Sequence, residues 1–501
     1  MSKIISFPIE LRPALPTVYG NVDYRRLEQQ LKRIEELLQL SGVEKQFIVW
    51  SMEAYELESK RRGIQIRAGA LEKQALASLR ALRGEVLRRL IGESFRGVAR
   101  AVAGCPLYQW FCHLGAVDGA RVPGKSAFQA YAHWLEEGKM RALVAILLQA
   151  ATEGNRSKPP LELANELEIR TVWMDSFCVK ANIHFPVDWV LLRDAVRTLM
   201  KAVMLIRRHG LRHRMPEPAA FLRRINTLSM EMTAVRRKAD SRKERKRVLR
   251  QMKALVRVVE SHAQRYRVLL DRQWSQTDWS RKQAEQVLGR IDGVLALLPQ
   301  AIHQAHERII GERRVPNAEK ILSLYEPDLE VMVRGKAQAE VEFGNKMFLA
   351  EAAHGLIVDW RLEKEGVSSD TALVKPSLVR LGRCLPDLKL WAVGADRGFA
   401  SDGNSTLLKR RGIFDGLCSR DPRQLEQQRR DPRFVAIQQR RAQTEGRIGI
   451  FQNMFLGNPF RAKGFEHRQV AVAWCVLVHD LWVLARLPRA KTIRVPLKKA
   501  A

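Results

Sequence analysis

The chain has 501 residues, which is long enough for two or three domains, and 46% of them are hydrophobic, as expected of a globular protein. Its 86 Lys and Arg residues against 54 Asp and Glu residues give a formal net charge of +32, which makes a polyanion, and nucleic acid first, the expected partner. The six cysteines are scattered without a C-x-x-C pair, which argues against a disulfide framework and against a zinc finger.

Neither export nor a membrane span is indicated. The opening MSKIISFPIELRP has no long apolar stretch and no small-residue cleavage site, so we expect a cytoplasmic, nucleoid-associated protein. The most apolar segment, residues 470–487, contains His479 and Asp480 near its middle, where a membrane span would suffer most. We therefore predict a buried helix there and no membrane partner.

Helices are predicted through most of the first 160 residues. Residues 1–60 form an N-terminal segment with a helix at 27–40. In residues 61–160, short amphipathic helices with basic edges follow one another, and Ser94 and Ser126 are candidate N-caps. This pattern is compatible with a DNA-binding region of the helix-turn-helix type, and an ordinary helical bundle fits it equally well. Residues 151–163, with Gly, Asn, Ser and Pro, predict a linker.

Strand-like segments lie on both sides of a long helical region. Residues 169–185 are β-branched and aromatic and predict one or two strands. Residues 191–320 are almost entirely helical in pattern. Strands are predicted again at 330–352, 355–363, 388–396 and 413–418, with helices at 372–383, 404–409 and through much of 432–487. We predict an α/β domain with a mixed sheet and flanking helices, formed by residues 161–190 and 321–487, with a helical insertion at 191–320 and a basic tail at 488–501.

Three acids occupy places suited to metal binding. Asp175 and Asp396 each end a strand-like run, and Glu445 lies in a helical segment. Carboxylates on separate rigid elements are the oxygen ligands that a site for two divalent metal ions needs. Because the chain has 54 acids, the pattern alone leaves rivals open. These rivals are Asp188, Asp194, Asp359, Asp402 and Asp480.

Four blocks of the sequence, in this order, resemble the DDE transposases of bacterial insertion sequences. They are MDSFCVKANIHFPVDWVLLRDAVR, SLYEPDLEVMVRGKAQAEVEFGNK, GADRGFAS and TEGRIGIFQNMFLG. The segment SFRGVARAVAGCPLYQWFCHLG is also similar to their N-terminal DNA-binding region. The resemblance covers most of residues 90–485. It implies a ribonuclease H-like catalytic domain in which Asp175, Asp396 and Glu445 are the catalytic residues and bind two Mg²⁺ ions, for which Mn²⁺ can substitute.

The resemblance also implies DNA contacts. Arg441, four residues before Glu445, matches an arginine that accompanies the glutamate in many relatives. Gln452 stands where those relatives often have a DNA-binding lysine, so this chain departs from the pattern there. Further candidates for phosphate contact, with exposed charges as the plainer alternative, are Arg334, Lys336, Lys346 and Arg397.

Two features of the predicted insertion have both a DNA-binding and a plain interpretation. The cationic run at residues 236–253 either contacts the DNA backbone or forms a solvated helix face. Trp274 or Trp279 either stacks on an unpaired base or belongs to the core of the insertion.

The predicted function is that of a metal-dependent DNA transposase. It would bind the terminal inverted repeats of its element, cleave the ends and join the 3′-hydroxyl ends to target DNA. Double-stranded DNA is the expected partner, and a homodimer is expected on DNA because two ends must be joined in one event. A catalytically decayed transposase that only binds DNA, and a structure-selective nuclease of the same fold, remain as alternatives.

Overall fold

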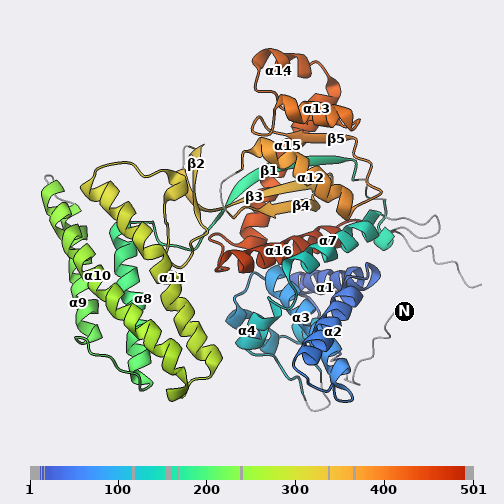
Figure 1. The fold of residues 1–501 in the computed structure, drawn as a ribbon. Coiled ribbons are helices and arrows are strands. Elements are labelled where there is room, and N and C mark those ends of the chain that lie inside the picture. Colours follow the sequence, from blue (N-terminus) through green and yellow to red (C-terminus); the bar gives the residue numbers. More distant parts are fainter. Residues whose placement is uncertain are drawn as a thin grey trace, which may run out of the picture. The chain divides into compact units, whose positions relative to one another are not determined.

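The computed structural model describes residues 12, 14–15, 17–115, 119–152, 160–165, 167, 169–236, 241–336, 339–364 and 368–490, without the side chains of residues 236, 334–336 and 339–340. The chain forms two compact units (Figure 1). The first comprises Met1–Val179, Lys346–Glu363 and Ser368–Ala501, and the second comprises Lys180–Asn345 and Lys364–Val367. The second unit therefore contains the whole of the predicted insertion, residues 191–320, and extends beyond it at both ends.

Helices make up the part of the first unit that precedes its sheet. Asn21 caps the first helix by accepting a hydrogen bond from the Tyr24 amide, and Ser94 caps α4 through the Gly97 amide, as predicted. The predicted cap at Ser126 is wrong, because α6 begins one residue earlier, after an extended Gly124. The helices are α1 (Val22–Leu40), α2 (Val43–Arg61), α3 (Ala70–Leu90), α4 (Phe95–Gly104), α5 (Pro106–Phe111), α6 (Lys125–Tyr131) and α7 (Glu137–Thr152), followed by the 3₁₀ turn η1 (Pro160–Glu162).

A mixed, open sheet of six strands confirms the predicted α/β class. Its strand order is β2-β3-β1-β5-β6, and β4 also pairs with β3. The β1–β5 and β5–β6 pairs are parallel, whereas β2–β3 and β3–β4 are antiparallel. The strands are β1 (Thr171–Lys180), β2 (Glu330–Lys336), β3 (Ala339–Ala352), β4 (Ile357–Leu362), β5 (Ala392–Ala395) and β6 (Phe414–Leu417).

Helices that follow the strands in the chain complete the first unit. They are α12 (Asp370–Cys384), α13 (Asp402–Arg410), α14 (Pro422–Gln428), α15 (Pro432–Ile450), the π-helical turn η5 (Phe451–Leu456) and α16 (Phe465–Ala485). Helix α16 lies between β4 and the helices α1, α3 and α7 (Figure 1). By length and composition it could cross a membrane, but 78% of its most apolar window is buried inside the protein. The predicted buried helix is therefore confirmed.

The second unit contains a helical bundle with its own hydrophobic core. Side chains such as Leu192, Val256 and Ile291 are fully buried in this core. Ser280 and Gln283 form a capping box that fixes the start of α11. The bundle consists of α8 (Asp188–Arg208), α9 (Pro218–Arg236), α10 (Arg242–Gln273) and α11 (Arg281–Ala305), with the short turns η2 (Trp274–Gln276), η3 (His306–Ile310) and η4 (Asn317–Glu319).

Candidate active site

Two of the predicted acids lie side by side at the sheet. In the parallel β1–β5 pair, the register ends at Met174 and Ala395, and Asp175 and Asp396 are the residues that follow this last pair. Asp396 directly follows β5, as predicted, but the prediction that Asp175 ends its strand is wrong, because β1 continues to Lys180. Neighbouring strands are about 4.8 Å apart, which brings the two carboxyl-bearing positions together. Both side chains are partly buried. The sheet thus unites two acids that are far apart in the sequence.

The turn after β5 explains why this strand ends in Asp-Arg-Gly. Asp396 accepts a hydrogen bond from the Gly398 amide at 2.8 Å, so its carboxylate also shapes the turn. A Cβ atom at Gly398 would lie 2.9 Å from Asp370 Oδ2 and 3.0 Å from Asp396 Oδ1. Only glycine leaves room for both carboxylates at this point.

Glycines in the sheet let α15, the helix that carries Glu445, approach closely. A Cβ atom at Gly394 of β5 or at Gly416 of β6 would lie only 2.5 Å or 2.9 Å from the Ile437 side chain. Next to Ile437, Gln438 donates hydrogen bonds to the carbonyls of Ala395, at 3.1 Å, and Gly416, at 2.6 Å. Helix α15 is therefore fixed to the carboxyl ends of β5 and β6, one residue from Asp396.

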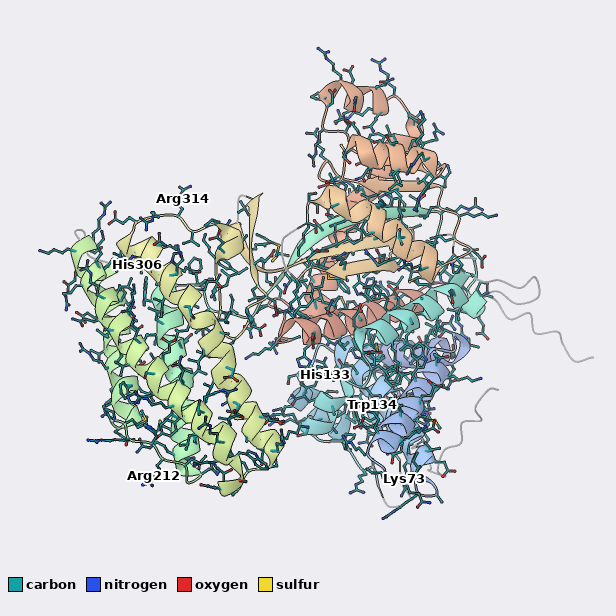
Figure 2. The ribbon with its side chains drawn as sticks, in the orientation of Figure 1. Lys73, His133, Trp134, Arg212, His306 and Arg314 are labelled. Carbon is teal, nitrogen blue, oxygen red and sulfur yellow. The ribbon has the colours of Figure 1, made fainter. Side chains whose placement is uncertain are left out.

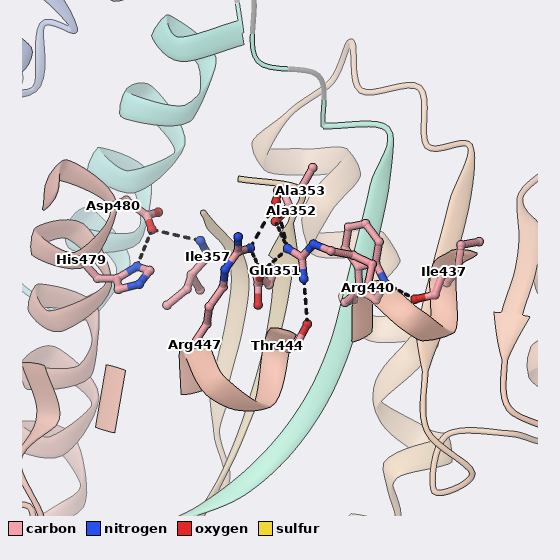
Figure 3. A network of polar contacts seen from close by, with 11 residues as sticks. Glu351, Ala352, Ala353, Ile357, Ile437, Arg440, Thr444, Arg447, His479 and Asp480 are labelled. Carbon is pink, nitrogen blue, oxygen red and sulfur yellow. Dashed lines mark hydrogen bonds and ion pairs between the residues drawn. The ribbon is translucent and has the colours of Figure 1, made fainter. Parts of the chain in front are cut away.

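A polar network fixes α15 on both sides of Glu445 (Figure 3). Arg440 lies 4.5 Å above the Trp173 ring of β1, and Trp173 donates a hydrogen bond to the Ile437 carbonyl at 2.9 Å. Arg440 also binds the buried Glu351 of β3 at 2.6 Å, and Arg447 pairs with the same carboxylate. Because both arginines are held, the helical turns between residues 440 and 447 cannot shift relative to the sheet.

Glu445 itself is exposed and pairs with Arg441. The Arg441 guanidinium lies 3.5 Å from Glu445 Oε1, and its Nε donates to Gln438 Oε1 at 3.3 Å. These side chains share one face of α15, at spacings of three and four residues. The Glu445 side chain is 67% exposed, so it is free to change rotamer.

The pKa of Asp175 shows that the predicted acids act on one another. Burial raises the pKa of Asp175 to about 6, and the negative charges of Asp396 and Glu445 add to the rise. The Ser176 amide and the positive charge of Arg441 act in the opposite direction. The four charged groups predicted from the sequence are therefore close enough to interact.

The acids fit a divalent cation, although they do not surround one position in this conformation. Among the residues that the structure describes, no three Asp, Glu, His or Cys side chains come close enough together to hold one metal ion. Asp175 and Asp396 are neighbouring carboxylates that repel each other, and their oxygen atoms are the donors that Mg²⁺ prefers. The third acid would join them only after Glu445 leaves Arg441.

A fourth acid near the site was missed by the sequence reasoning. Asp370, in the first turn of α12, accepts a hydrogen bond from the Ser176 hydroxyl at 2.7 Å. It also pairs with Lys346 at 2.6 Å. An acid in the first turn of a helix is fully explained by the helix itself, so the sequence carried no separate signal for a role at the site.

Lys346 is not the exposed charge of the plainer alternative, and its phosphate contact stays a prediction. Its side chain is only 8% exposed, and its ammonium group binds Asp370 and the Ser368 carbonyl. The sequence marked a basic residue on a strand, but it could not show that the side chain points into the protein.

The other predicted DNA contacts differ in what surrounds them. Gln452 donates a hydrogen bond to the Cys178 carbonyl of β1 at 3.4 Å, which ties η5 to the sheet. Arg397 is exposed beside Asp396, and its carbonyl accepts a hydrogen bond from Arg420 at 2.9 Å. Arg334 and Lys336 lie on β2 in the second unit, and their side chains are outside the described part of the chain.

Three of the rival acids are engaged in structural contacts. Asp188 is buried and binds Arg308 at 2.8 Å in the second unit. Asp359 is buried and binds Arg380 at 2.7 Å. Asp480, on α16, accepts from the Ile357 amide at 3.0 Å, and burial raises its pKa (Figure 3).

The two tryptophans of the helical bundle pack against its core, as in the plainer of the two interpretations. Trp274 and Trp279 are partly buried against the bundle core, and the Trp279 ring centre lies 4.5 Å from that of His209. Basic side chains such as Arg212 and Arg314 extend from the second unit (Figure 2). DNA contact by the cationic run at 236–253 stays a prediction.

Comparisons of the chain with protein-family models, with curated proteins and with solved structures give no match. Its function has to be argued from the site itself and from the motifs of its sequence. What the site offers is a pair of acids on neighbouring parallel strands, with a third acid on a helix docked to those strands.

Proposed function

We propose that this protein is a metal-dependent DNA transposase with a ribonuclease H-like catalytic domain. One observation carries the proposal: Asp175 and Asp396 directly follow the last residue pair, Met174 and Ala395, of two adjacent parallel strands, and the helix that carries Glu445 is docked at the end of β5. The sequence blocks around these three acids also occur in the same order as in the DDE transposases that they resemble. Their coupling through the pKa of Asp175 supports a common role.

The sheet supports the proposed fold at a finer level. Strand β1 lies between β3 and β5 and is parallel to β5, so Asp175 lies on a central strand and not on an edge strand. The helical bundle separates β1 from β2 in the chain, which agrees with a catalytic domain interrupted by an insertion. Such an insertion accounts for the wide spacing between Asp175 and Asp396.

In the proposed reaction, the side chains hold and orient the reacting groups. Asp175, Asp396 and Glu445 would hold two Mg²⁺ ions, which when bound activate water and then the 3′-hydroxyl for in-line attack on a phosphodiester and stabilise the leaving oxygen. Arg441 pairs with Glu445 and adds a positive charge where phosphate must approach. Gln438 fixes the helix against β5, so only the Glu445 side chain has to turn away from Arg441 to join the other two acids.

DNA is the proposed partner because of the charge of the chain. A net charge of +32 attracts a polyanion irrespective of its sequence. The helices within residues 61–160 are proposed to recognise the terminal inverted repeats, and Arg397 and Arg441 are proposed to contact phosphates near the acids. A homodimer on DNA and a location on the nucleoid belong to the same proposal.

Substitution of one acid tests the chemistry separately from DNA binding. Asp396→Asn should lower the nicking rate in Mg²⁺ or Mn²⁺ by more than about 100-fold, beyond the 10–100-fold typical of losing an outer partner of a metal ligand. DNA fragments carrying the sequences that flank the gene serve as substrate, and their binding should change by less than about twofold because one carboxylate contributes little to phosphate attraction. The matched control is Asp402→Asn, an exposed aspartate six residues away that should nick normally. Nicking by Asp396→Asn at the wild-type rate would refute the assignment.

The same assay separates the alternatives. If the wild-type protein binds the fragments but nicks them no faster in Mg²⁺ than in EDTA, it is a decayed transposase. A protein that nicks but does not join a precleaved 3′-hydroxyl end to a target plasmid would be a nuclease of the same fold. Joining of the end by the wild type is the outcome expected here.

A further inference from the structure

Asp370 touches the segments next to Asp175 and Asp396. Its Oδ1 atom accepts a hydrogen bond from the Ser176 hydroxyl at 2.7 Å. Its Oδ2 atom lies 2.9 Å, and Asp396 Oδ1 lies 3.0 Å, from the Cβ position of Gly398, so the two carboxylate oxygens are at most 5.9 Å apart. One side chain at the start of α12 therefore meets the end of β5 and the middle of β1.

Ser176 transmits this contact to Asp175. The Ser176 amide donates a hydrogen bond to Asp175 Oδ1 at 2.7 Å, while the Ser176 hydroxyl donates to Asp370. Asp370 thus holds the residue whose backbone fixes the carboxylate of Asp175. On the other side, the Gly398 amide fixes the carboxylate of Asp396 in the same manner, at 2.8 Å.

Lys346 neutralises the charge of Asp370, which would otherwise add to the repulsion between Asp175 and Asp396. Its ammonium group lies 2.6 Å from Asp370 Oδ1 and is held by the Ser368 carbonyl at 2.6 Å. The pair has no net charge, so it adds little repulsion to Asp175 and Asp396. A buried cation beside a partly buried acid is kept in place because separating them would leave a charge uncompensated.

We propose that Asp370, neutralised by Lys346, is a positioning residue that sets the separation of Asp175 and Asp396 through Ser176 and the turn at Gly398. Asp370 itself touches no reacting group in this arrangement. The inference rests on the proposed function, since that function is the reason why Asp175 and Asp396 must be held at a fixed distance. A role in starting α12 alone would leave the affinity of these acids for a cation unchanged.

Mn²⁺ affinity, measured by calorimetry without DNA, tests the inference. Ser176→Ala removes the hydroxyl that reaches Asp370, and Asp370→Asn removes the charge that Lys346 neutralises. Both variants should bind Mn²⁺ about 10- to 100-fold more weakly, the loss typical of outer partners of metal ligands. Ser176→Thr keeps the hydroxyl and should stay within about threefold of wild type, which rescues the effect of Ser176→Ala.

Thermal unfolding without metal separates positioning from stability. If Asp370→Asn unfolds, Ser176→Ala and Ser176→Thr still decide the question, because the first removes only the hydroxyl that bonds Asp370 and the second keeps it. Variants that melt earlier but bind Mn²⁺ as tightly as wild type would overturn the positioning role and leave the proposed function standing. A wild-type protein that binds no Mn²⁺ would refute both.

Discussion

Two clusters of buried or partly buried acids in the first unit differ in the direction in which the pKa of their central acid is shifted. Glu35, among the N-terminal helices, has its pKa lowered to about 2, whereas Asp175, at the sheet, has its pKa raised to about 6. Burial alone raises the pKa in both places. The difference comes from the neighbours, and it separates a cluster of paired charges from a cluster of carboxylates that repel one another.

The neighbours of Glu35 compensate its charge fully. Burial opposes ionisation, but His113 at 3.7 Å, Arg83 at 2.6 Å and Arg12 at 2.9 Å outweigh it. Arg83 is 0% exposed and also pairs with Glu44 at 2.8 Å. Because Glu35, Glu44 and Arg83 lie on α1, α2 and α3, the cluster ties these three helices together.

The neighbours of Asp175 act in both directions. Asp396 and Glu445 repel its charge and raise its pKa, whereas the Ser176 amide and Arg441, which is itself paired with Glu445, lower it. Asp175 thus lies among carboxylates that repel its charge. Acids with strongly perturbed pKa values cluster at functional sites.

The largest expected effect is at the compensated cluster. Arg83→Met should lower the free energy of unfolding by about 3–5 kcal/mol, because Glu35 and Glu44 lose a buried partner. Urea denaturation at pH 7 measures this loss. The matched control is Arg441→Met, which removes an arginine from an exposed pair and should cost less than about 1 kcal/mol. Equal losses in the two variants would break the contrast between the clusters.

A smaller effect of opposite sign is expected at the sheet. Because the folded pKa of Asp175 lies above its ordinary value, the folded state favours the protonated form, and stability falls as the pH rises from about 4 through about 6. Asp175→Asn keeps the side chain neutral and should raise the free energy of unfolding by about 1–3 kcal/mol at pH 7.5 without metal. At pH 3.5 the gain should vanish. Urea titrations in EDTA at both pH values would contradict the account if the variant were less stable at pH 7.5, or if its gain were the same at both.

Much of the fold was predictable from local patterns. The β-branched run around Asp175 formed a single strand, β1, and the segment around residues 330–352 formed the hairpin of β2 and β3. Helix α16 followed from its apolar composition, interrupted only by polar residues such as Asp480. Such elements depend on residues close together in the chain, so the sequence contains their signal.

The finer features of the site depend on tertiary contacts and were not predictable. Lys346 has the same basic character whether it faces solvent or Asp370, and only the packing of α12 against the strands decides which. The positions of Gly394 and Gly416 beneath Ile437 likewise need the helix and both strands together. The sequence predicted that Asp175 and Asp396 each end a strand, which holds for Asp396 but not for Asp175, because β1 continues to Lys180. That β1 and β5 are parallel neighbours could be seen only in the sheet.

The central claim is that Asp175, Asp396 and Glu445 receive a divalent metal ion that balances their charge. Anomalous diffraction from crystals of the whole chain grown with Mn²⁺ at pH 7.5 would test it most directly. We predict Mn²⁺ bound by oxygen atoms of Asp175 and Asp396, with Glu445 turned from Arg441 toward the same site. Saturating Mn²⁺ that binds elsewhere, or leaves these carboxylates without an ion, would contradict the account.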